Sequence, residues 1–243
     1  MWKKIISIAL LIFTLGCLYF MSKGAVGIIS AYFLITFNVA RVFMEVVAVK
    51  LLVDKSKIKT HIKEELPRKV GHMLVCFITY PMIYFSFKGT IHTIIFPALA
   101  LLFVLIARPF GLLNLFKREE TDDNLDSVIY LITGSLINFT IAYFNPAYLI
   151  PSALGVMSLG LGDPMACFVG KSVGKHKIYK RKTLEGTIGF IIGATIAMYI
   201  FSGLTLWKLL IVAICSAIVE LYSDKYDNAL IQIVCALVAF LII

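Results

Sequence analysis

The stretch GLGDPMACFVGKSVGKHKIYKRKTLEG, Gly160 to Gly186, joins two long apolar segments of the chain. We expect Asp163 to end the first segment and Glu185 to open the second, with a loop of six Lys and Arg residues between them. Pro164 lacks the backbone donor of a regular helix, so it predicts irregular backbone there. A carboxylate at membrane depth is costly without a partner, which makes Asp163 a candidate metal ligand. The alternative is a plain helix end with a solvated Asp.

The rest of the chain is typical of a membrane protein. Of its 243 residues, 60% are hydrophobic, whereas soluble domains are nearer half apolar. Apolar segments long enough to cross a bilayer recur along the whole length. They predict an all-α, polytopic transmembrane helical bundle of about nine spans that forms one domain, 1–243: 4–20, 25–53, 67–87, 91–113, 125–144, 147–170, 185–202, 207–222 and 228–243.

The distribution of cations predicts the orientation of this bundle. With the N-terminus inside, all but four of the 23 Lys and Arg residues lie on the inner side. Lys23, Lys88 and Lys208 fall outside, and Arg41 lies within a span. Cytoplasmic loops are enriched in Lys and Arg, so the expected arrangement is N-terminus inside and C-terminus outside. The net charge of +9 is then explained by topology and phosphate-bearing ligands, and we expect no nucleic-acid partner.

A second motif, Arg68-Lys69-Val70-Gly71-His72, begins the segment 67–87. On a helix His72 follows Arg68 by four residues and Lys69 by three, so the three side chains share one side. Arg and Lys are well suited to phosphate oxygens. A stop-transfer cluster with a satisfied histidine is the alternative.

Further polar residues lie near the same predicted surface. Lys182 and Thr183 precede Glu185, which makes a phosphate or Mg²⁺ role plausible, although Glu185 also suits a helix N-terminus. Glu220 lies inside an apolar segment and therefore requires a partner, and Asp227 and Asn228 follow it. The sequence Gly170-Lys171-Ser172 is not a P-loop, because that motif requires a glycine where Met165 stands.

A third group lies deeper in the membrane. Asn38, Arg41 and Glu45 share one face of the second segment. A self-neutralising Arg41–Glu45 pair is the favoured interpretation. A substrate site of an anion or phosphosugar transporter is the alternative.

The combined motifs resemble the polyprenol kinase family, which contains dolichol kinases, phytol kinases and CTP-dependent diacylglycerol kinases. The resemblance covers about 64–230 and rests on four motifs in order: RKxxH (68–72), GxGDxxAxxxGxxxGKH (160–176), KTLEG (182–186) and DN (227–228). The loop at 118–120 is similar to an RxEE motif, and Pro164 stands where many relatives have Ala. A distant similarity to phosphatidate cytidylyltransferases also exists.

The resemblance implies a multi-pass lipid kinase that uses CTP and a divalent metal, Mg²⁺, to phosphorylate a polyprenol, dolichol, phytol or diacylglycerol hydroxyl. We expect the active site on the cytoplasmic face, with Asp163 or His72 as the base and Glu185 as a further catalytic residue. The expected metal ligands are Asp163, Glu185 and Asp227. The expected nucleotide- and phosphate-binding residues are Arg68, Lys69, Gly162, Gly170, Lys171, Lys175, Lys182, Thr183 and Asn228.

Two other functions stay open at this stage. A cytidylyltransferase would convert CTP and phosphatidic acid to CDP-diacylglycerol, and a transporter would use Arg41 and Glu45. The lipid, the nucleotide and the oligomeric state, a homodimer included, are not fixed by the sequence.

Overall fold

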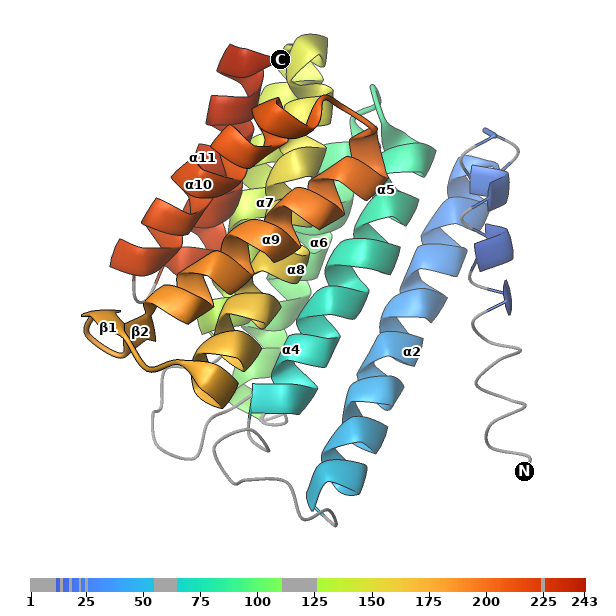
Figure 1. Ribbon diagram of the computed structural model, residues 1–243. Helices are drawn as coiled ribbons and strands as arrows, with labels where there is room; N and C mark the ends of the chain where they lie inside the picture. The colour runs from blue at the N-terminus through green and yellow to red at the C-terminus, as the bar shows by residue number, and fades with distance from the viewer. Residues whose placement is uncertain are drawn as a thin grey trace.

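The structure is a computed structural model that describes residues 26–54, 65–110, 126–223 and 226–243, with residues 12, 13, 15–17, 19–21, 23 and 24. Its helices form a bundle in which α8 occupies the middle and α2 lies at one side (Figure 1). The helices are α2 (Ile28–Asp54), α4 (Glu65–Leu74), α5 (Tyr80–Phe87), α6 (His92–Ala107), α7 (Asp126–Phe144), α8 (Leu149–Val173), α9 (Leu184–Ser202), α10 (Leu206–Tyr222) and α11 (Asp227–Ile242). Short turns η1 (Val75–Thr79), η2 (Arg108–Phe110) and η4 (Pro146–Tyr148) continue or join them.

The predicted all-α membrane bundle is confirmed. Within the described residues, six helices or continuous helix pairs are long and apolar enough to cross a membrane. They correspond to the predicted segments from 25–53 to 185–202. The last two predicted segments form α10, of 17 residues, and α11, of 16 residues, about 25 Å each at 1.5 Å per residue. Most of the first predicted segment, 4–20, lies outside the described residues.

The centre of the bundle depends on small residues that let helices approach closely. Helices α8 and α9 pack along their length, with Gly186, Gly189 and Gly193 of α9 against the backbone of α8. A methyl group at Gly193 would lie 2.8 Å from the carbonyl oxygen of Leu161. Membrane helices gain most from such close packing, since lipid supplies no hydrophobic drive between them. The α8–α9 pair is therefore a firm support for the loop between them.

The expectation that α8 ends at Asp163 is wrong. The helix continues through Pro164 to Val173, so Asp163 lies about ten residues, or roughly 15 Å, before its end. Proline is tolerated in a membrane helix where neighbouring groups satisfy the backbone groups it frees. Asp163 therefore lies well inside the bundle.

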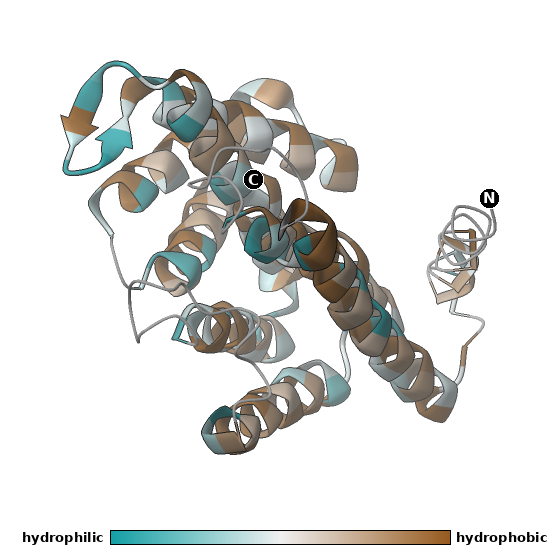
Figure 2. Ribbon diagram, turned by 90° about the horizontal axis from the view of Figure 1, so that it is seen from below, coloured by the Kyte–Doolittle hydropathy of each residue, from teal (hydrophilic) through white to brown (hydrophobic). Residues whose placement is uncertain are grey.

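The basic loop between α8 and α9 contains a small antiparallel hairpin, which the sequence did not predict. Strand β1 (Lys177–Tyr179) pairs with β2 (Lys182–Thr183), and Lys180 turns the chain with a φ of 48°. Seen along the bundle, the hairpin projects beyond the outline of the helices (Figure 2).

Candidate active site

Helices α4 and α8 run antiparallel, and their contacts form a ladder. Near the end of α8, Lys171 is 3.3 Å from Glu65 at the start of α4. Deeper in the bundle, Lys69 Nζ is 2.5 Å from Asp163 Oδ2. Beyond them Gly160 faces Cys76, and an added methyl group would lie 2.5 Å from the Cys76 Cβ. This register brings the RKxxH motif against the Gly-Asp motif, as the sequence analysis expected.

Asp163 is the centre of a buried charge group. Besides Lys69, it contacts His72, whose Nδ1 lies 3.2 Å from the same Oδ2. All three residues are less than a tenth exposed. A buried carboxylate is tolerated when charged partners surround it. The other ring nitrogen of His72, Nε2, is buried with no hydrogen-bond partner among the described residues.

Glu65 joins two cations that come from different helices. Its Oε2 accepts from Arg68 Nη2 at 2.6 Å and Nε at 3.1 Å, and its Oε1 is 3.3 Å from Lys171 Nζ. Glu65 is itself only 4% exposed. A fork contact of this kind fixes the guanidinium plane. We did not expect this role for Glu65, although its position three residues before Arg68 was a usable signal.

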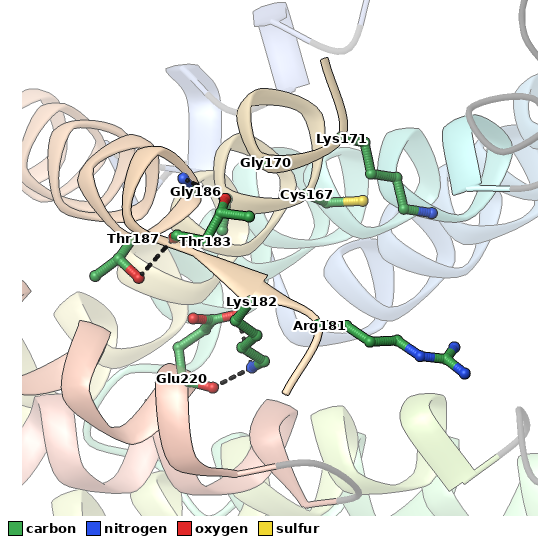
Figure 3. Close-up of a pocket in the computed structure, with 10 residues that line it drawn as sticks. Cys167, Gly170, Lys171, Arg181, Lys182, Thr183, Gly186, Thr187 and Glu220 are labelled. Carbon is green, nitrogen blue, oxygen red and sulfur yellow. Dashed lines mark hydrogen bonds and ion pairs between the residues drawn. The ribbon is translucent and has the colours of Figure 1, made fainter. Parts of the chain in front are cut away.

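Lys182, at the base of the hairpin, is held by the end of α10. Its Nζ is 2.8 Å from Glu220 Oε1 and also donates to the backbone oxygen of Glu220. Figure 3 shows the two side chains pointing toward each other. The prediction that Glu220 requires a partner is confirmed.

A cavity of about 120 Å³ opens beside these cations. Its walls come from the end of α8, the hairpin, the start of α9 and the end of α10 (Figure 3). Four of the residues at this cavity were predicted to bind phosphate: Gly170, Lys171, Lys182 and Thr183. Arg181 was not among the predicted residues. The lining residues are Ala166, Cys167, Gly170, Lys171, Arg181, Lys182, Thr183, Gly186, Thr187 and Glu220.

The cavity and the Asp163 group belong to one electrostatic cluster. Cys167 lines the cavity one turn after Asp163 and lies within electrostatic range of Asp163, Lys69 and Lys171. Asp227, at the start of α11, interacts in the same way with Asp163, Lys69 and Lys182. The site therefore extends from the cavity mouth to the buried Asp163.

Comparison of the amino-acid sequence with known proteins identifies relatives of this chain. The chain is 32% identical over 187 residues to dolichol kinase sec59 of Schizosaccharomyces pombe, which covers 68% of the chain and 37% of that protein. It is 32% identical over 130 residues to dolichol kinase of Saccharomyces cerevisiae, covering 49% of the chain and 24% of that protein. The chain belongs to the polyprenol kinase family.

Other comparisons set the extent of this relationship. An uncharacterized protein of Methanocaldococcus jannaschii is 34% identical over 131 residues, which cover 52% of the chain and 63% of that protein. The matches to the first relatives thus span less than two thirds of the relatives' own lengths. No family model and no solved structure matches the chain.

The resemblance to polyprenol kinases predicts a Mg²⁺ site formed by Asp163, Glu185 and Asp227. Among the described residues, no group of three or more His, Cys, Asp and Glu side chains is arranged to hold a metal. Mg²⁺ commonly takes only one or two protein carboxylates and completes its shell with water and substrate phosphates. Asp163 and Asp227 interact electrostatically, and each offers the carboxylate oxygens that Mg²⁺ prefers.

Glu185 does not join this group. Its Oε1 is 2.7 Å from Nδ1 of His176, and its carboxylate also accepts from the His176 backbone N–H. Glu185 is not one of the residues that line the cavity. The contact ties the start of α9 to the residue just before β1, so Glu185 positions the loop.

Three other residues that the sequence placed in the phosphate site do not line the cavity. Gly162 faces the ring of Phe190, which would lie 2.9 Å from an added methyl group. Asn228 is buried and donates from Nδ2 to Ser127 Oγ at 2.8 Å. Lys175 is exposed and outside the cavity lining. Helix packing, which a single sequence does not specify, decides these positions.

Thr183 combines a structural and a binding position. Its Oγ1 accepts from the backbone N–H of Gly186 at 3.2 Å, which caps α9, while the residue also lines the cavity. The loop at 118–120, which is similar to an RxEE motif, lies outside the described part of the chain.

Proposed function

We propose that this protein transfers the terminal phosphoryl group of a nucleoside triphosphate, CTP, to the hydroxyl of a polyprenol-type lipid alcohol. One observation carries the proposal: Lys171 of α8 and Lys182 of β2 line one cavity. One turn before Cys167 in the cavity wall, the buried carboxylate of Asp163 pairs with Lys69 of α4. The dolichol kinase names of the relatives support a membrane polyprenol kinase.

The cavity residues would bind the triphosphate. Lys171 and Arg181 offer cations at the mouth, and α9 begins at its wall with Thr183 as its cap. A helix N-terminus favours phosphate through its unpaired N–H groups and its dipole. Lys182 would exchange part of its contact with Glu220 for phosphate oxygens. These cations would stabilise charge that spreads over the transferred group.

Asp163 and Asp227 would hold Mg²⁺ against the phosphate oxygens. The ion would supply neutralisation of charge on the phosphates when bound. Lys69 keeps the Asp163 carboxylate in place through the contact at 2.5 Å. The orientation of Asp163 is thus fixed before any substrate arrives.

In the reaction, the lipid hydroxyl oxygen forms a bond to the terminal phosphorus while the bond to the leaving nucleoside diphosphate breaks. The hydroxyl proton passes to a base, for which Asp163 and His72 are the two candidates. His72 Nε2 lies buried beside Asp163 with no partner within the described chain. The lipid would reach this point sideways from the bilayer, with the nucleotide arriving from the cytoplasmic face.

The test uses the purified full chain in vesicles with CTP labelled at either the α or the γ phosphorus. A panel of polyprenol, dolichol, phytol and diacylglycerol identifies the acceptor, and ATP in place of CTP identifies the donor. Transfer of γ label to a lipid alcohol supports the proposal. Transfer of α label to phosphatidic acid would instead make the protein a cytidylyltransferase, and uptake of phosphosugar without lipid product would make it a transporter.

A further inference from the structure

The hairpin β1–β2 has one side in the cavity and another directed away from it. Lys182 and Thr183 of β2 line the cavity, whereas β1 lies outside its lining. Seen along the bundle, the hairpin extends past the helices, over the region that surrounding lipid would occupy (Figure 2). The hairpin also sits at the level where α8 ends and α9 begins, which is the surface of the membrane domain.

The hairpin is strongly cationic. The segment 175–183 contains five Lys and Arg residues and no acid. Lys182 is paired with Glu220, but within the described chain no ion pair includes Lys175, Lys177 or Arg181. All three are exposed. Cations at this level attract anionic lipid headgroups.

Apolar and aromatic side chains accompany these charges. Ile178, between Lys177 and Tyr179, is 48% exposed. The Tyr179 ring packs against Tyr222 at the end of α10, with 5.1 Å between ring centres, and Tyr226 nearby in sequence is 53% exposed. Tyrosine is enriched at membrane interfaces because its ring is apolar and its hydroxyl polar. A segment with an exposed Ile beside cations and tyrosines suits a position on lipid better than one in water alone.

We propose that the hairpin binds the headgroups of anionic lipids beside the bundle. Lys175 and Lys177 contact lipid phosphates, and Ile178 inserts at the boundary of the acyl chains. A free nucleotide explains this surface less well, because Lys175, Lys177 and Ile178 lie outside the cavity lining. The proposal does not depend on which reaction the cavity performs.

The test places an indole on the hairpin by Ile178→Trp, in a full-length Trp2→Phe/Trp207→Phe background. The protein is reconstituted in phosphatidylcholine vesicles with an equal mole fraction of brominated phosphatidylglycerol or brominated phosphatidylcholine. Both lipids carry the quencher at the same depth. We expect an enrichment of the anionic quencher of about fivefold for each engaged cation at low salt, which falls as salt is added.

Paired variants locate the effect. Lys175→Gln/Lys177→Gln should remove most of the preference for the anionic quencher, whereas Lys88→Gln/Lys208→Gln, the same charge change at the opposite end of the bundle, should leave it intact. Equal quenching by the two lipids, no quenching by either, or equal losses in the two double variants would each overturn the proposal.

A second measurement needs no substitution. Amide hydrogen exchange in 175–183 should be slower in anionic than in neutral nanodiscs for the unaltered protein. If addition of CTP slows exchange there while the lipid charge has no effect, the hairpin serves the nucleotide and not the membrane, and the proposal fails.

Discussion

Two groups of charges lie within the apolar helices of this protein, and they differ in how they are neutralised. On α2, Arg41 Nε is 3.6 Å from Glu45 Oε1, four residues along the same helix. Between α4 and α8, Lys69 and Asp163 meet from residues 94 apart in sequence. Glu45 is 38% exposed in its side chain, whereas Asp163 is 9% exposed.

The α2 charges are neutralised within one helix, whereas the Asp163 group is assembled from two helices. The α2 pair neutralises itself, as the sequence analysis favoured, and Asn38 beside it donates to Thr79 Oγ1 at 3.2 Å. The Asp163 group exists only because two helices pack in one register, and its neighbours Glu65 and Lys171 add further charges. Cross-helix burial of several ionisable groups is costly, and this cost is expected where the site has a function.

The strongest test of this contrast removes the charge of Asp163. Asp163→Asn keeps the side-chain shape but leaves Lys69 without its counter-charge and removes a proposed metal ligand. We expect lipid phosphorylation to fall by about 10³-fold or more, measured as transfer of γ label in vesicles. Asp126→Asn is the matched control, since Asp126 pairs with Arg108 at the same end of the bundle, 3.3 Å away. Comparable losses in both variants would remove the special role of Asp163.

A smaller effect is expected at the cavity mouth. Lys182→Gln removes a cation that a bound phosphate would share with Glu220. The KM for the nucleotide should therefore rise by about 10- to 100-fold, which corresponds to the free energy of one charge-assisted hydrogen bond. Initial rates at varied CTP measure it. Lys208→Gln, on the opposite end, should leave KM unchanged. An unaltered KM in Lys182→Gln would exclude Lys182 from the phosphate site.

The packing of α8 against α4 can be tested separately from chemistry. Gly160→Ala adds a methyl group 2.5 Å from Cys76 Cβ, whereas Gly27→Ala, just before α2, adds one with nothing within 4 Å. The first should destabilise the protein by about 1–3 kcal/mol, as overpacking does, and the second should have little effect. Thermal denaturation in detergent, followed by size-exclusion chromatography, compares them. Equal melting temperatures would contradict the close approach of the two helices.

The smallest effect is expected on α2. Arg41→Gln/Glu45→Gln removes both partners of the pair together, so no buried charge is left alone and stability should change by only about 0.5 kcal/mol. Phosphorylation of lipid should continue at a rate near that of the unaltered protein. A large loss of turnover would show that the α2 pair belongs to the active site, and loss of phosphosugar uptake would revive the transporter.

Much of the architecture was predictable because apolar length is a local property. The eight segments that fall largely on described residues all form helices, with bounds shifted by a few residues. The end of α8 was predicted wrongly, because the effect of Pro164 depends on neighbours that the sequence does not show. The hairpin was missed because its two strands are only three and two residues long.

The site was predictable in part, and the reason differs from residue to residue. Lys69 and Asp163 were recognised by charge within apolar sequence, and both occupy the buried cluster. Gly162 was assigned to phosphate binding because a glycine leaves room for a ligand to approach the backbone. In the structure the Phe190 ring occupies that space. Glu185 was assigned to metal because it follows a basic loop, but its carboxylate contacts His176.

The amino-acid sequence alone predicts a helical membrane protein, with charges near a few helix ends and with the motifs of polyprenol kinases. These properties follow from composition and order along the chain. Three sets of contacts appear only in the folded chain: Asp163 with Lys69 and His72, Glu65 with Arg68 and Lys171, and Glu185 with His176. Such pairings depend on the register between helices, which is set by close contacts such as Gly160 against Cys76.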